Sequence, residues 1–334
     1  MKHLLPAALF AATLATALST PAAAQSDILL RLRSGSPLGD RFRVDSASGL
    51  VARGVLGIGI IPQSGAGERM MWHPYRASFR AGSIGSGGTQ WDDASQGFYS
   101  WAGGYNTTAS QIATFAFGYQ ASAQAPYSIS MGHTTNADGQ GAVAIGYRST
   151  ADADYSLALG QRASTNGHAG AIVIADGSTT DSIEASANNQ FSVRAAGGYR
   201  LFSNATETTG MSMNAGGSSW LVISDRSRKQ DFLGVDGEDL LARIRGIPVT
   251  TWRYRDEVDR TVLHIGPMAQ DWQRAFGFSA DGTTINMSDF DGVNLAAVQA
   301  LSARTERLQA ENAALRKRLA RVEAQAARGR TTKQ

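Results

Sequence analysis

The sequence predicts a mainly β protein with a helical C-terminal part: a parallel β-roll, then a small α+β domain, then a coiled coil. Three observations predict this order. Glycines recur every fourteen residues through the middle of the chain, the composition changes to charged helix formers at Ser224, and apolar residues recur in alternating steps of three and four from Val298. Neither a thin roll nor a narrow helical seam buries its apolar surface alone, so we expect assembly with copies of the chain.

Residues 1–24 have the pattern of a cleavable signal peptide. Lys2 gives a basic start, an apolar stretch runs from about Leu4 to Leu18, and small residues at 22–24 precede Gln25. The apolar stretch is too short to hold a helix across a bilayer. We therefore expect export without membrane insertion, to the periplasm, the cell surface or the medium of a bacterium.

Residues 25–96 are expected to form a β-rich region that caps the roll. Short alternating runs broken by glycine indicate irregular β structure in this region. An uncovered solenoid end exposes unpaired backbone groups. Met70, Met71 and Trp72 are therefore expected to cover the open edge of the first coil.

Residues 97–180 carry the glycine repeat and are expected to form the roll. Fourteen extended residues at about 3.3 Å each can make a closed coil of two short strands and two turns, and stacking at about 4.8 Å pairs each strand with its copies. Glycine suits the tight turns because it accepts positive φ. A small residue two positions before each glycine predicts a core one side chain deep. The glycines are Gly104, Gly118, Gly132, Gly146 and Gly160, and the small residues are Ala102, Ala116, Ser130, Ala144 and Ala158.

Residues 97–178 resemble the head repeats of trimeric autotransporter adhesins of the YadA type. The resemblance lies in the phrases AFGYQASA, AIGYRSTA and LALGQRAS, where an apolar residue and glycine are followed by Ser, Thr or Ala at alternating positions. The resemblance implies a left-handed roll in which three chains pack side by side, and hence a homotrimer.

Residues 181–223 are expected to be a β-rich connector, residues 298–327 a coiled coil, and residues 328–334 a disordered tail. The helical seam is two residues in seven wide and the opposite face is charged, so the helix is expected to pair with its own copies. A buried Asn312 would fix the register at some cost in stability. The seam residues are Val298, Leu301, Thr305, Leu308, Asn312, Leu315, Leu319, Val322 and Ala326.

Three phrases mark the C-terminal third: SDRSRKQDF at 224–232, HIGPMAQDW at 264–272 and SDFDGVNLAAVQAL at 288–301. Together they resemble the C-terminal intramolecular chaperone of phage tail spikes and endosialidases, over residues 224–334. The resemblance implies a trimerisation chaperone, with its peptidase domain at 224–297, that drives three chains into register and then cuts itself off.

The same resemblance implies the site residues. Ser224 and Lys229 occupy the serine and lysine positions of the motif Ser-Asp-x-x-x-Lys, and cleavage would fall between Ile223 and Ser224. A serine hydroxyl is a poor nucleophile unless a base takes its proton, and a neutral lysine can be that base. Asp225 is expected to cap the helix that follows it. His264 either orients the serine or the oxyanion, or hydrogen-bonds within the trimer.

The composition argues against several kinds of site. The chain has no cysteine, which excludes disulfides and thiolate chemistry, and its five histidines are far apart, so we expect no metal site and no cofactor. The net charge is +3, and the basic residues are expected to cluster only near the C-terminal end. Residues 97–180 are almost uncharged, so we expect no nucleic-acid partner.

These observations favour a secreted, adhesin-like trimeric fibre whose C-terminal domain is a trimerisation chaperone and a self-cleaving peptidase. Two alternatives stay open: a chaperone domain that has lost cleavage, and an enzyme acting on an external substrate such as a polysaccharide. The enzyme alternative has no support from a pair of carboxylates, because the sequence shows no such pair in a domain that could hold an active site. The outward Thr, Ser, Asn and Gln residues leave the ligand open among cell-surface, extracellular-matrix and glycan partners.

Overall fold

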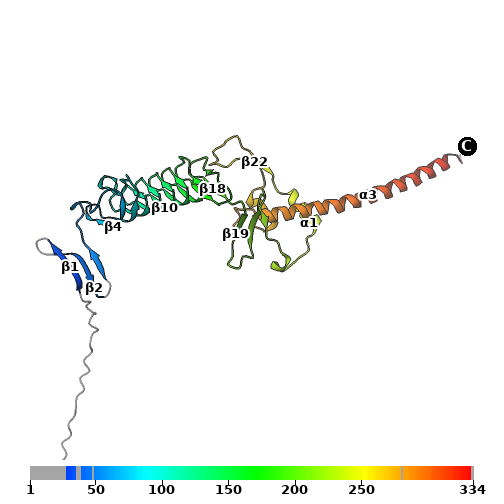
Figure 1. Ribbon diagram of the computed structural model, residues 1–334. Helices are drawn as coiled ribbons and strands as arrows, with labels where there is room; N and C mark the ends of the chain where they lie inside the picture. The colour runs from blue at the N-terminus through cyan, green and yellow to red at the C-terminus, as the bar shows by residue number, and fades with distance from the viewer. Residues whose placement is uncertain (1–27, 35–38, 47–48, 280, 332–334) are drawn as a thin grey trace, which may run out of the picture. The chain divides into compact units, whose positions relative to one another are not determined.

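The computed structural model describes residues 28–34, 39–46, 49–279 and 281–331, so the expected signal peptide at 1–24 lies outside the described residues. The chain divides into two compact units, Met1–Ile223 and Ser224–Gln334. Figure 1 shows the elements of each unit. The boundary is the peptide bond before Ser224, the residue at which the composition changes.

The first elements form a three-stranded antiparallel sheet. Its strands are β1 (Ile28–Ser34), β2 (Gly39–Asp45) and β3 (Leu50–Ala52), in the order β1-β2-β3. The Asp45 carboxylate accepts a hydrogen bond from the backbone N–H of Gly49 at 2.9 Å, which holds the turn between β2 and β3.

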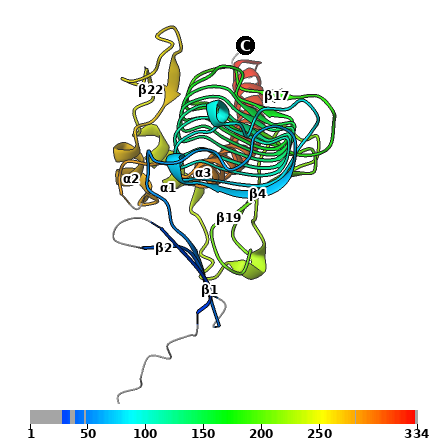
Figure 2. The same cartoon turned by 60° about the vertical axis from the view of Figure 1, so that its left-hand side comes forward.

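A parallel β-roll follows, as the glycine period predicted, and Figure 2 shows its coils as stacked loops. One wall is a nine-stranded sheet in the order β18-β16-β14-β12-β10-β8-β6-β5-β4, and the other is a six-stranded sheet in the order β17-β15-β13-β11-β9-β7. Neighbouring coils pair one full repeat apart, so that Gly132 lies opposite both Gly118 and Gly146. The longer strands are β6 (Trp101–Tyr105), β8 (Phe115–Tyr119), β10 (Ile129–His133), β12 (Val143–Tyr147), β14 (Leu157–Gln161), β16 (Ile172–Ala175) and β18 (Phe191–Arg194). The shorter strands are β7 (Thr108–Ala109), β9 (Ser122–Ala123), β11 (Asn136–Ala137), β13 (Thr150–Ala151), β15 (Ala163–Ser164) and β17 (Ile183–Glu184).

The interior of the roll is a column of small side chains, as predicted. The residues two positions before the glycines are all 0 % exposed, and so are the alanines that face them from the six-stranded wall. Interiors are close-packed, so a larger side chain in this column would force the walls apart. The facing alanines are Ala109, Ala123, Ala137 and Ala151.

The repeated glycines are required for two reasons. Their φ angles lie between 99° and 126°, where side chains are strained. A Cβ on Gly132 would also overlap the backbone carbonyl oxygen of Gly146, and the same overlap recurs from coil to coil. The period in the sequence is therefore a backbone requirement of the stacking.

The N-terminal end of the roll is closed by two strands outside the fourteen-residue period. β4 (Gly67–His73) runs antiparallel to β5 (Ser78–Ile84), and β5 starts the parallel stack by pairing with β6. Met71, one of the three residues expected to cover this end, is buried in a cluster with Trp91, whereas Met70 is exposed.

Arg80 of β5 enters the column of small residues at this end. It lies opposite Ala102 and is fully buried. Its guanidinium donates to the carbonyls of Ser100 at 3.0 Å and Ala109 at 2.9 Å. A long cation bound to backbone carbonyls thus fills the space that alanine fills in the next coil.

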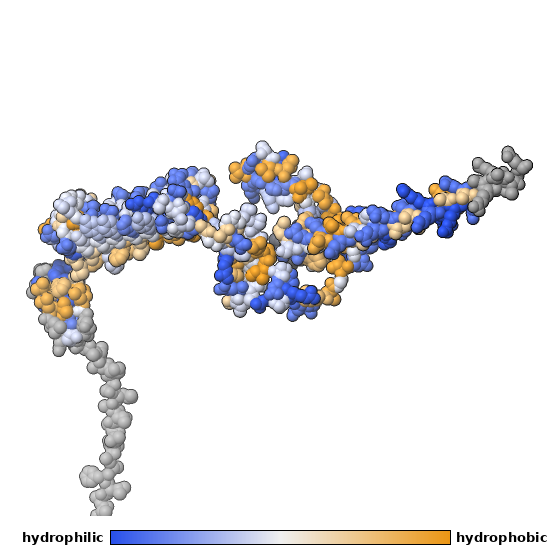
Figure 3. All heavy atoms as spheres, turned by 45° about the vertical axis from the view of Figure 1, so that its right-hand side comes forward, coloured by the Kyte–Doolittle hydropathy of each residue, from blue (hydrophilic) through white to orange (hydrophobic). Residues whose placement is uncertain are grey.

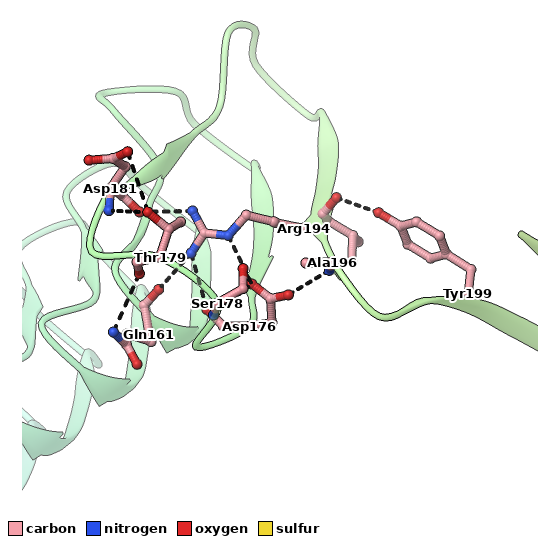
Figure 4. Close-up of polar contacts among 9 residues, drawn as sticks. Gln161, Asp176, Ser178, Thr179, Asp181, Arg194, Ala196 and Tyr199 are labelled. Carbon is pink, nitrogen blue, oxygen red and sulfur yellow. Dashed lines mark hydrogen bonds and ion pairs between the residues drawn. The ribbon is translucent and has the colours of Figure 1, made fainter. Parts of the chain in front are cut away.

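The C-terminal end of the roll is closed by Arg194, drawn in Figure 4. Its Nε donates to Asp176 at 2.9 Å and its Nη1 to the carbonyl of Asp181 at 2.8 Å. The backbone N–H of Ala196, the hydroxyl of Ser178 and the Arg194 guanidinium hold the pKa of Asp176 well below its usual range. The parallel sheet continues to Arg194, beyond the boundary at 180 that the glycine repeat indicated.

An antiparallel sheet ends the first unit. Its strands are β19 (Gly198–Phe202), β20 (Gly210–Asn214) and β21 (Leu221–Val222). The hydroxyl of Tyr199 donates a hydrogen bond to the carbonyl of Val193 at 2.8 Å, and this bond connects the sheet to the last coil of the roll. The region expected to be a β-rich connector therefore contains the end of the roll and this sheet.

The second unit is α+β. It contains α1 (Gly237–Arg245), the antiparallel pair β22 (Thr250–Trp252) and β23 (His264–Gly266), α2 (Ala269–Phe276) and α3 (Met287–Thr331). Leu240, Trp272 and Val293, one from each helix, form its core. Apolar residues in the first turns of α3 therefore pack in the core of the second unit.

Helix α3 is longer than the expected coiled coil. It starts before residue 298 and continues into the segment expected to be a disordered tail; residues 332–334 lie outside the described residues. The predicted seam is exposed along it, from 48 % at Leu301 and Leu308 to 64 % at Val298. Orange and pale-orange residues interrupt the blue surface of this helix in Figure 3. A single chain leaves the seam without an apolar partner over residues 298–326 of the described helix.

Candidate functional site

The candidate site lies at the chain boundary between the two compact units. Strand β21 ends at Val222, and the backbone N–H of Ile223 still bonds the carbonyl of Gly210 at 3.3 Å. A short 3-10 turn, Arg226–Arg228, follows immediately. The bond between Ile223 and Ser224 is therefore the link between a sheet strand and a tight turn.

The turn brings the predicted nucleophile and base together. Nζ of Lys229 donates to Oγ of Ser224 at 2.7 Å. Lys229 ends the turn, and its backbone N–H bonds the carbonyl of Arg226. One turn between the two residues folds the lysine back toward the serine, which a continuous strand could not do.

Asp225 supports this turn from its N-terminal end. Its carboxylate accepts the backbone N–H of Ser227 at 2.8 Å. The N–H and hydroxyl of Ser227, with a smaller contribution from Arg228, hold the pKa of Asp225 below its ordinary value. The group therefore acts as an ionised cap, which is the usual role of aspartate at such a position.

Ser224 and Lys229 are both exposed in the single chain. A lysine that serves as a general base works from its neutral form, and removal from water favours that form. The single chain thus holds the serine and the lysine within hydrogen-bonding distance and leaves both exposed to water.

His264 has its described hydrogen bonds elsewhere in the second unit. Its Nε2 lies 3.1 Å from both carboxylate oxygens of Glu257, and its ring stacks on Trp252 with centroids 4.6 Å apart. It holds the segment between β22 and β23, so among the described residues its hydrogen bonds do not include Ser224. Glu257 was missed in the sequence because it lies in none of the three family-like phrases.

Two further findings concern residues 28–34, 39–46, 49–279 and 281–331. Within these ranges, histidines and acids do not form a group of three or more that could hold a metal ion. Among the described helices, none has both the length and the apolarity needed to cross a membrane.

Comparison with known proteins places two families on the chain, in the predicted order. Residues 224–280 match the family described as chaperone of endosialidase, Peptidase_S74. Residues 109–135 and 137–163 match two copies of the YadA head domain repeat. Searches of curated proteins and of solved structures found no match.

The matches confirm both resemblances for these segments, and the first residue of the chaperone match is Ser224. Proteins of both families are typically trimeric and extracellular or surface-located. The combination supports a trimeric, adhesin- or tail-fibre-like protein with a chaperone domain.

Proposed function

We propose that this protein is an exported homotrimeric fibre whose second unit sets three chains in register and is then released by cleavage between Ile223 and Ser224. One observation carries the proposal: a serine and lysine 2.7 Å apart lie at the peptide bond that divides the chain into its two compact units. A site of self-cleavage is expected between parts that have to separate, and this peptide bond joins the last residue of the first unit to the first residue of the second.

The outer face of the nine-stranded wall supports the trimer. Residues that flank the buried small column point outward, and many are large, apolar and exposed. Contiguous apolar surface of this kind marks an interaction site. The exposed members include Trp101, Phe117, Ile145, Ile172 and Phe191. We infer that this face and the seam of α3 are covered by the two other chains.

A roll of near-identical coils needs help to find its register. Sliding one chain by a single coil would still set apolar residues against apolar residues, because Phe117, Met131 and Ile145 occupy equivalent positions. Helix α3 differs in this respect, since Asn312 lies on an otherwise mainly apolar seam and disfavours shifted pairings. The second unit therefore supplies the register that the roll lacks.

The proposed reaction begins with attack of Ser224 Oγ on the carbonyl carbon of Ile223. Lys229 takes the hydroxyl proton, the bond from that carbon to the Ser224 nitrogen breaks, and the proton passes to this nitrogen. Water then hydrolyses the ester, leaving a carboxylate at Ile223 and the restored hydroxyl at Ser224. Because the pair is exposed in one chain, we infer that a neighbouring chain covers Lys229 and that cleavage follows trimer formation.

Mass spectrometry of the full chain tests this proposal. We expect denatured wild type to give two fragments that separate at Ile223 and Ser224, and Ser224→Ala and Lys229→Arg to stay uncleaved. Lys317→Arg, the same change on exposed α3, is the matched control and is expected to cleave. Wild type that stays at its own uncleaved mass would contradict cleavage. The mass of the native assembly would then show whether the protein is still a trimer, as the chaperone role requires.

A further inference from the structure

We propose that a row of tyrosines along one edge of the roll, Tyr99, Tyr127 and Tyr155, binds an extended, uncharged polysaccharide with β-1,4 linkages. The three residues occupy the same turn position in alternate coils, and each is more than half exposed. The inference deepens the adhesin part of the proposed function and rests on it, because it names the class of ligand that the fibre would hold.

The tyrosine row follows a period twice that of the glycines. Its members recur at every second repeat of fourteen residues, and Ala113 and Gly141 hold the equivalent position in the coils between them. The backbone N–H of each tyrosine bonds a carbonyl of the coil before it, at 2.9 Å for Tyr127 and at 2.8 Å for Tyr155. Two coils at about 4.8 Å each therefore place neighbouring tyrosines about 10 Å apart along the roll.

The backbone at this position is in the left-handed region. The φ angles of Tyr99, Tyr127 and Tyr155 are 59°, 65° and 57°, a region that bulky residues rarely adopt. Gly141 holds the same conformation with a φ of 64°, where glycine is not strained. The turn can thus be built without a side chain, and tyrosine is present in spite of a cost in backbone strain. Strain of this kind is found at binding sites.

The small residues of the intervening coils place no ring beside the tyrosine row. A Cβ on Gly141 would already lie 3.2 Å from Cδ1 of Tyr155, so a large side chain there would contact the ring. The other end of the long strands differs, because Tyr119 and Tyr147 both stack on His133 with centroids 4.9 Å and 5.0 Å away. An open aromatic face can pack against the C–H groups of a sugar ring, whereas a face covered by another ring cannot.

The spacing of the row fits an extended polysaccharide. About 10 Å is the length of one disaccharide unit in an extended β-1,4-linked chain, so every second sugar could stack on a tyrosine. A polyproline helix repeats over a similar length, about 9 Å per turn. Such peptides are held in grooves between aromatic side chains, whereas a whole coil separates Tyr127 from Tyr155. The row therefore favours the polysaccharide.

The turns that carry the row are neutral or acidic. Together they hold three aspartates and neither lysine nor arginine. This composition disfavours a polyanion, including a nucleic acid, because phosphate contacts require cations. Carboxylate, amide and hydroxyl side chains can hydrogen-bond the hydroxyl groups of a neutral sugar. The residues of these turns are 96–99, 110–113, 124–127, 138–141 and 152–155.

The row lies beside the face that we assign to contacts between chains. Tyr127 is in the turn between β9 and β10, and Tyr155 is in the turn between β13 and β14. At these turns the chain passes from the six-stranded to the nine-stranded wall, and the apolar side chains assigned to the trimer are on the nine-stranded wall itself. Three such rows in one trimer would raise the avidity for a polymer.

Titration calorimetry of the purified full chain with cellohexaose and chitohexaose, two uncharged β-1,4-linked probes, tests the inference. We expect at least one to bind, and to bind at least about tenfold more tightly than its disaccharide, which reaches a single tyrosine. Tyr127→Ala with Tyr155→Ala is expected to weaken that binding at least about tenfold, because two stacking faces are lost. Tyr127→Phe with Tyr155→Phe keeps both faces and is expected to keep most of the binding.

Tyr119→Ala with Tyr147→Ala is the matched control. It removes two tyrosines that are also two coils apart, but whose rings stack on His133. We expect this variant to bind the hexasaccharide as wild type does. Circular dichroism checks that each variant keeps the fold of the roll.

Several results would overturn the inference. Binding of neither hexasaccharide by wild type would do so, as would equal binding by the two alanine variants. Tighter binding to a polyproline peptide than to both sugars would assign the row to another partner. Loss of the trimer in Tyr127→Ala with Tyr155→Ala, but not in the matched control, would assign the row to contacts between chains.

Native mass on the same samples separates this test from the proposed function. A trimer whose sugar binding is indifferent to Tyr127 and Tyr155 contradicts only this inference. A monomer whose sugar binding depends on these two tyrosines contradicts only the fibre.

Discussion

Gly132 lies directly opposite Gly146 in the next coil, and a Cβ on Gly132 would overlap the carbonyl oxygen of Gly146. The same relationship joins the other glycines of the period. The roll therefore depends on close backbone approach at one position per coil, and this dependence is testable.

Gly132→Ala is expected to destabilise the roll by about 2–4 kcal/mol, because it adds a backbone clash to a strained positive φ. Chemical denaturation followed by circular dichroism measures the change. Gly197→Ala is the control, since a Cβ there meets nothing within 4 Å and its φ is not positive. Equal stability of the two variants would refute the close-approach explanation.

Ala144→Leu is expected to cost about 1–3 kcal/mol, because Ala144 is fully buried in a column with room for one small side chain. Ile145→Leu, the neighbouring outward position, conserves volume and is expected to leave the unfolding midpoint nearly unchanged. An Ala144→Leu variant as stable as this control would show that the interior can expand.

The C-terminal end of the roll is expected to loosen in acid. The folded-state pKa of Asp176 is depressed, so its contribution is present above the unfolded carboxyl pKa of about 4 and is lost as pH falls toward the folded value. Hydrogen exchange at the Ala196 amide measures the opening between pH 6 and pH 3.

Asp176→Asn is expected to give fast exchange at both pH values. Asp181→Asn is the matched control, because Arg194 bonds the backbone carbonyl of Asp181 and not its carboxylate. Protection at Ala196 that is independent of pH in wild type would argue against the role of the carboxylate.

The seam of α3 is expected to hold the trimer together. Leu308→Ala with Leu315→Ala removes two exposed seam side chains, and we expect trimers to dissociate at concentrations at least about tenfold higher than for wild type. Gln309→Ala is the control on the same helix. Sedimentation at several concentrations gives the oligomeric state, and an unchanged trimer in the double variant would assign the contact elsewhere.

Repetition explains how much of the fold was predictable. Five copies of the coil present the same turn glycine and a small residue, alanine or serine, two positions before it, so the period alone indicates the roll, its thin interior and its pairing register. Ser224 and Lys229 were predicted as a pair from the family resemblance, and they lie close together in the structure because a single capped turn joins them.

The ends of the roll depended on contacts between distant residues. Arg80 occupies the small column although its coil does not keep the period, and Arg194 reaches back to Asp176 after an irregular loop. In the second unit, the hydrogen bond between His264 and Glu257 likewise depends on how the loop between β22 and β23 folds back. Such contacts depend on loop lengths and bulges that local patterns do not encode.

The sequence by itself determined the coil, its glycines and the serine–lysine spacing, because each is a local backbone requirement. Only the tertiary structure decided that Arg80 enters the column of small residues and that the bond before Ser224 joins two compact units. Strand pairing and chain packing are non-local, so the closed ends of the roll and the division into two units emerge only once the chain is folded.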